Sequence, residues 1–495
     1  MSRGGSTRPP RLPGLAWAVP ACLALAALSL LAPSTPSYDP WAWLVWGREI
    51  VAFDLDTRFG PSWKPLPVLF TTPFSLFGEA APELWLIVAR AGALVGLVAA
   101  FRLARRLAGA IGGVLAAAAL ALSDGYLRGA ALGFSEGLLV ALTLVAVERH
   151  LEGRRAQALA LGFGAGLLRP ETWPFLGLYA LYVFVREPRA RVLTAGLMAL
   201  LPVLWLGPEL WGAGDPFRAA SRAQEPTRFS AAFAESPALA VLVRAAGIVP
   251  WAAKVGVVVA VVLAPLAAVA GAPLGGRARV ALREWTGGRG PALVVLVLAA
   301  VAAIWFALVA IMTEAGYAGN SRYLAMPAAL SCVVGGAGLG WLARALGTAL
   351  ERARGPREAV GRPGPRSVLV AGVVIVAAAA ATAGGPLSTL AGDSREVADA
   401  ARLDADLPQA IARAGGRTRV RACGQPFATA LQVPAVAWQL RVATGRVGIE
   451  PRGPGTYFRG PPALQPPDVP APPATSGGLR PIARLGEWTV SAHCR

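Results

Sequence analysis

The sequence has few charged residues and very few histidines. Only 15% of its 495 residues are Asp, Glu, Lys or Arg, while 55% are hydrophobic. This composition excludes a soluble globular protein, because soluble domains carry about 25% charged residues. The chain is therefore expected to be a polytopic α-helical membrane protein.

Histidine is too scarce for a histidine-based zinc site. The two histidines, His150 and His493, are expected on opposite sides of the membrane, and protein zinc sites need three or four ligands. The sequence also lacks a P-loop, a Gly-rich dinucleotide fingerprint, an HExxH motif and a Gly-x-Ser-x-Gly motif in a supporting context. These absences argue against the enzyme classes that those motifs identify.

Apolar runs dominate residues 1–384. We identify about eleven spans that approach the ~30 Å thickness of the hydrocarbon at 1.5 Å per residue, from residues 14–33 to residues 367–384. After residue 384 the apolar fraction falls, and Asp, Arg, Gln, Pro and Gly become common. The sequence therefore predicts a transmembrane domain, 1–384, and a soluble domain, 385–495.

The net charge of +19 raises the question of nucleic-acid binding, and the placement of the arginines argues against it. Up to residue 384, the ends and loops assigned to the cytoplasm carry 22 Arg, and those assigned to the outside carry 9 Lys or Arg. This is the positive-inside bias of proteins in the cytoplasmic membrane. It predicts an N-terminus inside, a C-terminal domain outside, and contacts of the arginines with anionic membrane lipid rather than nucleic acid.

The densest cluster of unusual residues is the first polar segment after an apolar run, residues 37–78. Asp39 opens it where hydrocarbon gives way to water, a costly place for a charge without a function. From Trp41 to Phe53, apolar residues at helical spacing include three tryptophans, which predicts a short helix in the membrane interface. Three prolines then prevent a continuous helix around Lys64, so its ammonium is expected on irregular backbone at the same rim.

The order of these features resembles the first external loop of GT-C-fold glycosyltransferases that use lipid-linked sugars, most closely the aminoarabinose transferase and protein mannosyltransferase branch. The matching residues are Asp39, Gly47-Arg48-Glu49-Ile50 and Trp63-Lys64-Pro65-Leu66-Pro67. The match covers roughly the first hundred residues. It departs from the family twice, because Pro40 stands where a second acid is frequent and the turn is Lys-Pro-Leu-Pro instead of Lys-Pro-Pro-Leu.

This resemblance implies a membrane enzyme that takes a sugar from a polyprenyl-phosphate donor and transfers it to an acceptor hydroxyl outside the membrane. Asp39 would act as the general base or orient the hydroxyl, and Lys64 would hold the donor phosphate.

A second segment with a specific pattern is Asn320-Ser321-Arg322-Tyr323, after a Gly-rich turn at the outer end of a predicted span. It resembles the Arg-Tyr element found late in many GT-C enzymes. Arg322 suits a phosphate because its planar fork donates two parallel hydrogen bonds, and Tyr323 would share the phosphate site. The alternative is an arginine that extends to the interface beside an interfacial tyrosine.

Other charged residues at the outer rim have two interpretations each. Arg169 and Glu171 flank a proline and either pair with each other or line a polar cavity. Asp124 and Glu136 would bind acceptor or metal, although a helix cap and a first-turn acid are the simpler explanations. The Asp54-Leu55-Asp56 tripeptide is a candidate ligand set for a divalent metal or an ordinary loop feature.

The C-terminal domain is predicted to be a small α/β module. A helix is expected over 395–414, strands over 417–423, 441–449 and 488–492, and a Pro-rich loop over 461–473. Cys423 and Cys494 both lie in this domain, and an oxidising compartment would allow them to form a disulfide.

Two other classes of function also fit the composition. A transporter or flippase of lipid-linked sugars needs charged residues in a helical bundle, but the hydropathy contains no inverted repeat and the charges lie at the rim rather than the midplane. A catalytically inactive relative would act as a binding protein through its C-terminal domain.

Overall fold

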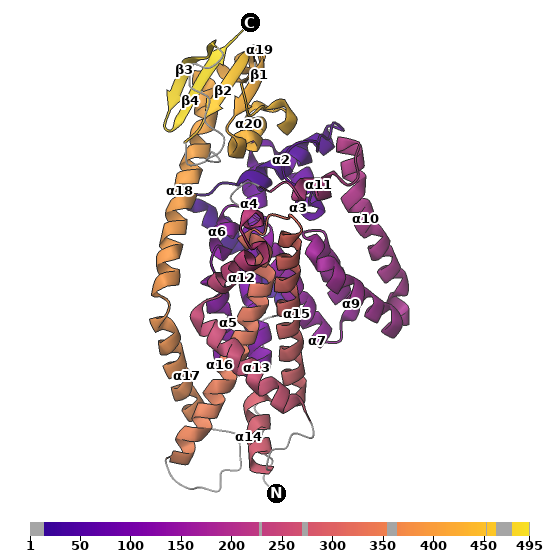
Figure 1. Ribbon diagram of the computed structural model, residues 1–495, viewed down its shortest axis with the longest axis vertical. Helices are drawn as coiled ribbons and strands as arrows, with labels where there is room; N and C mark the ends of the chain where they lie inside the picture. The colour runs from indigo at the N-terminus through magenta and orange to yellow at the C-terminus, as the bar shows by residue number, and fades with distance from the viewer. Residues whose placement is uncertain are drawn as a thin grey trace.

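The computed structural model describes residues 14–226, 230–269, 276–353, 364–451, 453–461 and 478–494. Its long axis runs from a small sheet at one end to α14 at the other, with the helical bundle between them (Figure 1).

Helices form almost all of the chain before the sheet. The early helices are α1 (Leu15–Leu28), α2 (Tyr38–Val51), α3 (Pro65–Phe74), α4 (Ala81–Ala108), α5 (Ala110–Ala121), α6 (Tyr126–Ala131), α7 (Glu136–Leu151), α8 (Arg155–Gly166), α9 (Trp173–Arg186) and α10 (Arg191–Ala213). The later ones are α11 (Arg218–Ala223), α12 (Pro237–Ile248), α13 (Trp251–Ala268), α14 (Gly276–Thr286), α15 (Arg289–Glu314), α16 (Ala325–Ala353), α17 (Pro365–Ala381), α18 (Gly384–Arg413), α19 (Gly416–Ala422) and α20 (Val433–Leu440).

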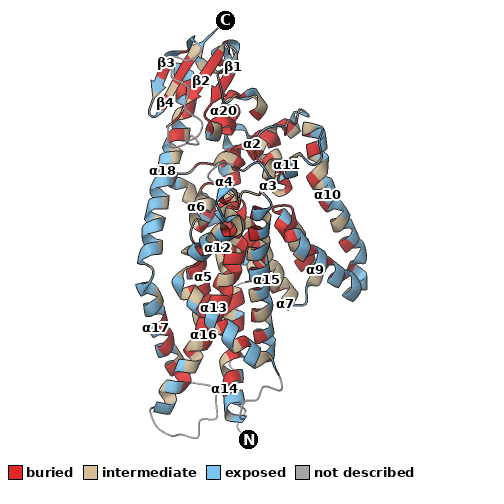
Figure 2. Cartoon of the chain, viewed as in Figure 1, coloured by how far each residue is buried: buried red, intermediate tan, exposed pale blue. Residues whose placement is uncertain are grey.

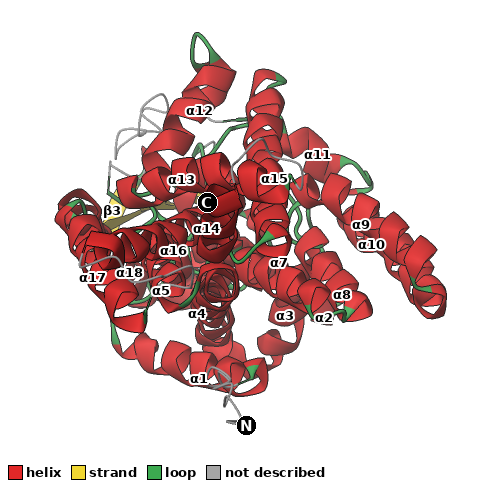
Figure 3. Ribbon diagram, turned by 90° about the horizontal axis from the view of Figure 1, so that it is seen from below, coloured by secondary structure: helices red, strands yellow, loops and turns green. Residues whose placement is uncertain are grey.

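Helix α16 is the centre of the bundle, and α4, α5, α13, α15 and α17 pack around it (Figures 2 and 3). Its most apolar window is 89% buried, against 22% for that of α10. The helices approach closely because small residues line the crossings. A methyl group at Gly338 would collide with the Gly256 carbonyl of α13, and one at Gly336 would meet Ala116 of α5. Lipid offers little hydrophobic driving force between helices, so such close van der Waals packing stabilises the bundle.

Several helices are long and apolar enough to cross a membrane. Among the described residues, five helical segments meet this test by length and composition, or six if the bent pair α17 and α18 counts as one span. The protein is thus a multi-pass membrane protein. The count of about eleven spans remains a prediction, because α5, α7, α8 and α9 have only 12 to 16 residues.

The chain leaves the bundle through α17 and α18, which meet at an angle of 54°. Helix α18 begins at Gly384, next to the start of the predicted soluble domain, 385–495; this division of the chain stays a prediction. Much of α18 is exposed along the side of the molecule before it reaches the sheet (Figures 1 and 2).

The C-terminal sheet contains β1 (Gln425–Ala428), β2 (Gly455–Arg459), β3 (Arg480–Leu485) and β4 (Trp488–His493) in the order β1-β2-β4-β3. β1 and β2 are parallel, and the other two pairs are antiparallel. With α18, α19 and α20 beside it, the sheet forms the small α/β module that the composition predicts.

Two of the three predicted C-terminal strands are wrong. Residues 417–423 are almost entirely α19, because Gly415 and Gly416 at positive φ allow a new helix to start there. Residues 441–449 contain a short 3-10 turn, Thr444–Arg446, after Arg441 in the left-handed conformation. The predicted strand 488–492 is β4, and the predicted helix 395–414 is the second half of α18. Most of the Pro-rich loop 461–473 lies outside the described residues.

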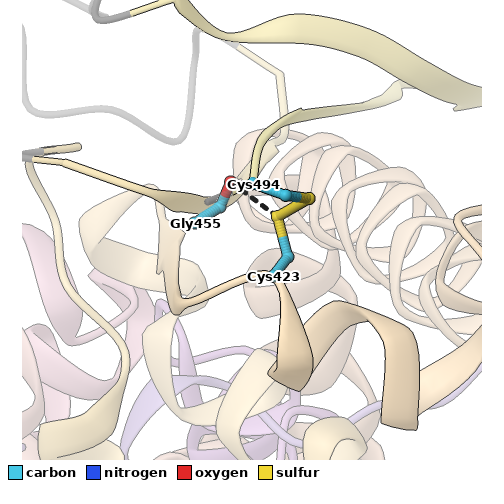
Figure 4. The surroundings of a disulfide bond; sticks show 3 residues. All are labelled: Cys423, Gly455 and Cys494. Atoms are coloured by element: carbon cyan, nitrogen blue, oxygen red, sulfur yellow. Dashed lines mark hydrogen bonds between the residues drawn. A yellow bond between two sulfur atoms is a disulfide. The ribbon is translucent and has the colours of Figure 1, made fainter.

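A disulfide joins Cys423, after α19, to Cys494, after β4 (Figure 4). The two Cα atoms are 4.4 Å apart, and 71 residues separate the cysteines in sequence. The bond closes the C-terminal domain on itself, and a loop of this length contributes about 4 kcal/mol to stability in the chain-entropy estimate.

We expect thiol alkylation of unfolded, non-reduced protein to modify two cysteines, Cys22 and Cys332, and alkylation after reduction to modify four. Intact mass measures the number directly. Four modified cysteines without reduction would show that Cys423 and Cys494 are free thiols.

Candidate active site

Asp39 lies in the first turn of α2, and almost the whole of this helix is buried. The predicted helix is present, and its position in the membrane interface stays a prediction. Trp43 and Trp46 are fully buried, because Trp43 packs edge-on against Trp85 of α4 and Trp46 packs against Trp63. The C-terminal domain contacts the helix through α20. The guanidinium of Arg48 donates to the carbonyl oxygens of Trp438, at 3.2 Å, and Val442, at 2.9 Å.

Lys64 directly precedes α3, whose first residue is Pro65. Proline is favoured at this position because it has no N–H to leave unpaired. The Lys64 side chain is 9% exposed, and its Nζ lies 3.9 Å from a carboxylate oxygen of both Asp39 and Glu136. The ammonium also faces the ring of Trp43 at 5.1 Å. Among the described residues it has no hydrogen-bond partner.

Burial lowers the pKa of Lys64 to about 8. The neighbouring guanidinium groups of Arg169 and Arg322 lower it further, and the carboxylates of Glu136 and Asp39 oppose them. Desolvation disfavours the charged form of a lysine, which explains the direction of the shift.

Arg322 comes from the 3-10 turn Ser321–Leu324, just before α16. Its Nη1 donates to Asp39 Oδ2 at 2.6 Å, across 283 positions of sequence. Its guanidinium faces the ring of Phe134 at 5.1 Å. The side chain is 28% exposed, more than those of Asp39 and Lys64, so its donors remain within reach of a ligand.

Glu136, which neighbours Lys64, continues the cluster to Arg169 and Glu171. Arg169 donates to Glu136 and has a carboxylate oxygen of Glu171 at 3.6 Å. It also stacks on the ring of Tyr323, 4.3 Å from the ring centre. Arg169 therefore pairs with Glu171, as one of the two interpretations predicts, and belongs to the charged cluster around Lys64. The cavity-lining role stays a prediction.

Seven of the eight predicted site residues thus form one cluster with three cations and three carboxylates, in which Arg322 and Tyr323 are half-buried and the others are buried. They are Asp39, Lys64, Glu136, Arg169, Glu171, Arg322 and Tyr323. Asp124 lies outside this cluster, because its side chain is exposed and near Asp393 of α18. The sequence argument gave no role to Trp43 or Phe134, whose rings face Lys64 and Arg322. Their aromatic character beside charged segments was the available signal.

The candidate metal ligands of the first loop do not form a ligand set. Asp56 binds Arg58 at 2.8 Å, and Asp54 is exposed. Within the described ranges, no group of three or more His, Cys, Asp or Glu side chains lies close enough together to hold a metal ion.

No protein-family model and no curated protein matches the sequence. Solved structures do match the fold. ArnT from Cupriavidus metallidurans in the apo state has a TM-score of 0.55 at 16% identity, and its complex with undecaprenyl phosphate has 0.52 at 15%. Both comparisons cover 97% of each chain. The Archaeoglobus fulgidus oligosaccharyltransferase tethered with an acceptor peptide has a TM-score of 0.43 at 16% identity, over 88% of this chain and 64% of its own.

These neighbours are membrane glycosyltransferases that use polyprenyl-phosphate-linked donors. The apolar helices around α16 and the small C-terminal sheet domain are the parts of the fold that the sequence predicts. This chain therefore has the GT-C fold of the polyprenyl-phosphate-dependent glycosyltransferases.

Proposed function

We propose that this protein is a glycosyltransferase that moves a hexosyl or pentosyl group from a polyprenyl-phosphate donor to a hydroxyl of a glycan, lipid or protein. One observation carries the proposal. The buried Lys64 ammonium lies 3.9 Å from Asp39 with no hydrogen-bond partner among the described residues, and Arg322 lies beside it. Unpaired buried donors are costly, so this arrangement favours an anionic ligand such as a phosphate.

The cluster supports a direct displacement at the sugar. The acceptor oxygen attacks C1 while the bond from C1 to the phosphate oxygen breaks, and the polyprenyl phosphate leaves with that electron pair. Asp39 takes the proton of the acceptor hydroxyl. Lys64 and Arg322 stabilise the negative charge that grows on the phosphate. A single displacement inverts the configuration at C1.

The remaining residues of the cluster support Asp39, Lys64 and Arg322. Glu136 and Glu171 balance the charge of Arg169, which packs against Tyr323. Without these carboxylates the three cations would repel one another in a poorly solvated site.

An assay of the purified protein with a panel of labelled polyprenyl-phosphate sugars tests the proposal. We expect release of polyprenyl phosphate together with glycosylated acceptor in detergent. Absence of transfer in detergent, combined with movement of the lipid-linked sugar across liposomes, would identify a transporter instead.

The orientation proposed here places the cluster and the C-terminal domain outside the cytoplasmic membrane. A cysteine at Ser321 or Ser394, both exposed, should react with a membrane-impermeant thiol reagent in intact cells, and a cysteine at the exposed Arg366 should not. The opposite labelling pattern would reverse every assignment of side.

Binding of the polyprenyl-phosphate carrier should weaken as the pH rises through about 8. Lys64 is charged below its lowered pKa and neutral above it, so the phosphate loses one cation at alkaline pH. Lys64→Arg keeps its charge over this range. A titration of carrier affinity against pH should therefore decline for wild type and stay flat for Lys64→Arg; the same alkaline decline in both would exclude Lys64 as its source.

A further inference from the structure

The segment that carries Lys64 has no regular secondary structure of its own. Residues 54–64, between α2 and α3, form neither helix nor strand. Side chains of α2 hold its first part, since Trp46 donates to the Asp56 carbonyl and Glu49 accepts from the Asp56 N–H. The second part, next to Lys64, depends on other elements.

The outer end of α10 holds one side of this segment. The Thr57 hydroxyl donates to Glu209 Oε2 at 3.1 Å, and both residues are fully buried. The indole of Trp63, the neighbour of Lys64, donates to the Leu204 carbonyl at 3.1 Å. A methyl group at Gly212 would press against Thr57, so the two backbones meet closely.

The short helix α11 holds the segment through two arginines. Arg218 donates to the carbonyl oxygens of Pro61, at 2.7 Å, and Gly60, at 3.1 Å. Arg222 donates to the same Gly60 oxygen at 3.1 Å. Charged donors on carbonyl oxygens make strong hydrogen bonds. These carbonyls lie three and four residues before Lys64, so the arginines fix the backbone from which its ammonium extends.

Arg222 also interacts with Tyr38, the residue before Asp39. Burial raises the pKa of Tyr38, and Arg222 opposes this rise because it interacts with the Tyr38 hydroxyl. Tyr38 directly precedes Asp39. Arg222 thus bonds to the segment of Lys64 and interacts electrostatically with the residue before Asp39.

These contacts are unusual for the position of α10 in the fold. The helix stands out from the side of the bundle with α9, and most of its surface is exposed (Figures 1, 2 and 3). Its outer end nevertheless buries the Glu209 carboxylate completely, with Arg218 at 3.8 Å. A buried acid at the end of a membrane helix is expensive and marks a functional position.

We propose that Arg218 and Arg222 are positioning residues for the donor-phosphate site. They hold residues 60–61 so that the Lys64 ammonium faces Asp39 and Arg322. This inference rests on the proposed function, because it assumes that Lys64 binds the donor phosphate. It adds α11 to the residues that shape the site, although neither arginine bonds to a residue of the cluster itself.

A double-mutant cycle on the full-length protein tests the inference, with farnesyl phosphate as the probe and its Kd as the readout. We expect Arg218→Gln and Arg222→Gln each to raise Kd about tenfold, as for loss of a hydrogen bond with a charged partner. In a Lys64→Ala background each should change Kd less than about twofold, because the group that they position is gone. A purely structural role would give the same change in both backgrounds and would overturn the inference.

Two further variants complete the experiment. Arg58→Gln is the matched control, because Arg58 lies in the same segment but is exposed and, among the described residues, its side chain bonds to Asp56 of that segment alone. It should leave Kd unchanged. Arg218→Lys keeps the charge but loses the planar fork that donates to both carbonyl oxygens, so its Kd should lie between those of wild type and Arg218→Gln. If Lys64→Ala leaves Kd unchanged, the proposed donor site is wrong. If Lys64→Ala raises Kd but the arginine variants leave Kd unchanged, the donor site stands and the positioning role is wrong.

Discussion

Asp39→Asn is expected to lower the turnover number by about 10² to 10⁴, the usual contribution of a positioned general base. Asparagine keeps the size of the side chain and accepts a hydrogen bond from Arg322, but its amide does not take the acceptor proton. Binding of the polyprenyl-phosphate carrier should persist or tighten. The substitution removes the negative charge that Arg322 contacts at 2.6 Å and Lys64 at 3.9 Å, so one anion fewer competes with the phosphate for these two cations.

Single-turnover transfer at saturating donor and acceptor measures this effect, with carrier affinity measured separately. Asp124→Asn is the matched control, because it makes the same chemical change on an exposed carboxylate outside the cluster. It should transfer sugar at the wild-type rate. Wild-type turnover in Asp39→Asn would mean that Asp39 is only a structural partner of Arg322.

The transmembrane character of the chain and the candidate residues Asp39, Lys64 and Arg322 could be predicted from sequence, because they depend on local signals. Asp39 and Lys64 stand at the edge of apolar runs, and Arg322 follows a Gly-rich turn at the same edge. Topology puts such positions on one side of the membrane. That Arg322 and Asp39 form one ion pair, 283 positions apart, follows only from the packing of α16 against the bundle.

Local rules could not separate Asp124 from Glu136. Both acids lie near the start of a helix in the stretch between α5 and α7, where either one favours a helix N-terminus. Glu136 turns inward because α7 packs tightly on α4, where a methyl group at Gly137 would overlap Ala93. Asp124 remains at the surface. This difference comes from tertiary contacts that no short window of sequence contains.

The surroundings of the helix α2 also depend on tertiary contacts that a short window of sequence does not contain. Its apolar residues at helical spacing, three tryptophans among them, predict a helix in the membrane interface. In the structure the C-terminal domain packs on this helix, because Trp41 contacts Trp438, and Asp404 of α18 accepts hydrogen bonds from Thr35 and the Trp41 indole. The periodicity of one segment does not predict contacts with another segment more than 360 residues away.

Lys64→Ala should be the second most damaging single change, with kcat/KM reduced about 10³-fold. Lys64 is expected to touch the phosphate in both the ground state and the transition state, so its loss weakens donor binding and also slows the chemical step. Removal of one donor aimed at developing charge typically costs about 10² to 10³ in rate. The removal also leaves Glu136 without one of its two cations, although Arg169 still donates to it.

Steady-state kinetics with the donor varied at fixed acceptor separates these contributions, because KM for the donor should rise while kcat falls. Lys254→Ala is the matched control. Lys254 also faces a tryptophan ring, that of Trp251 at 5.7 Å, but it lies on α13 away from the carboxylates of the cluster. We expect its kinetics to match wild type. If Lys64→Ala raises KM but leaves kcat unchanged, Lys64 binds the donor equally well in the ground state and the transition state. Arg322 would then stabilise the departing phosphate without Lys64.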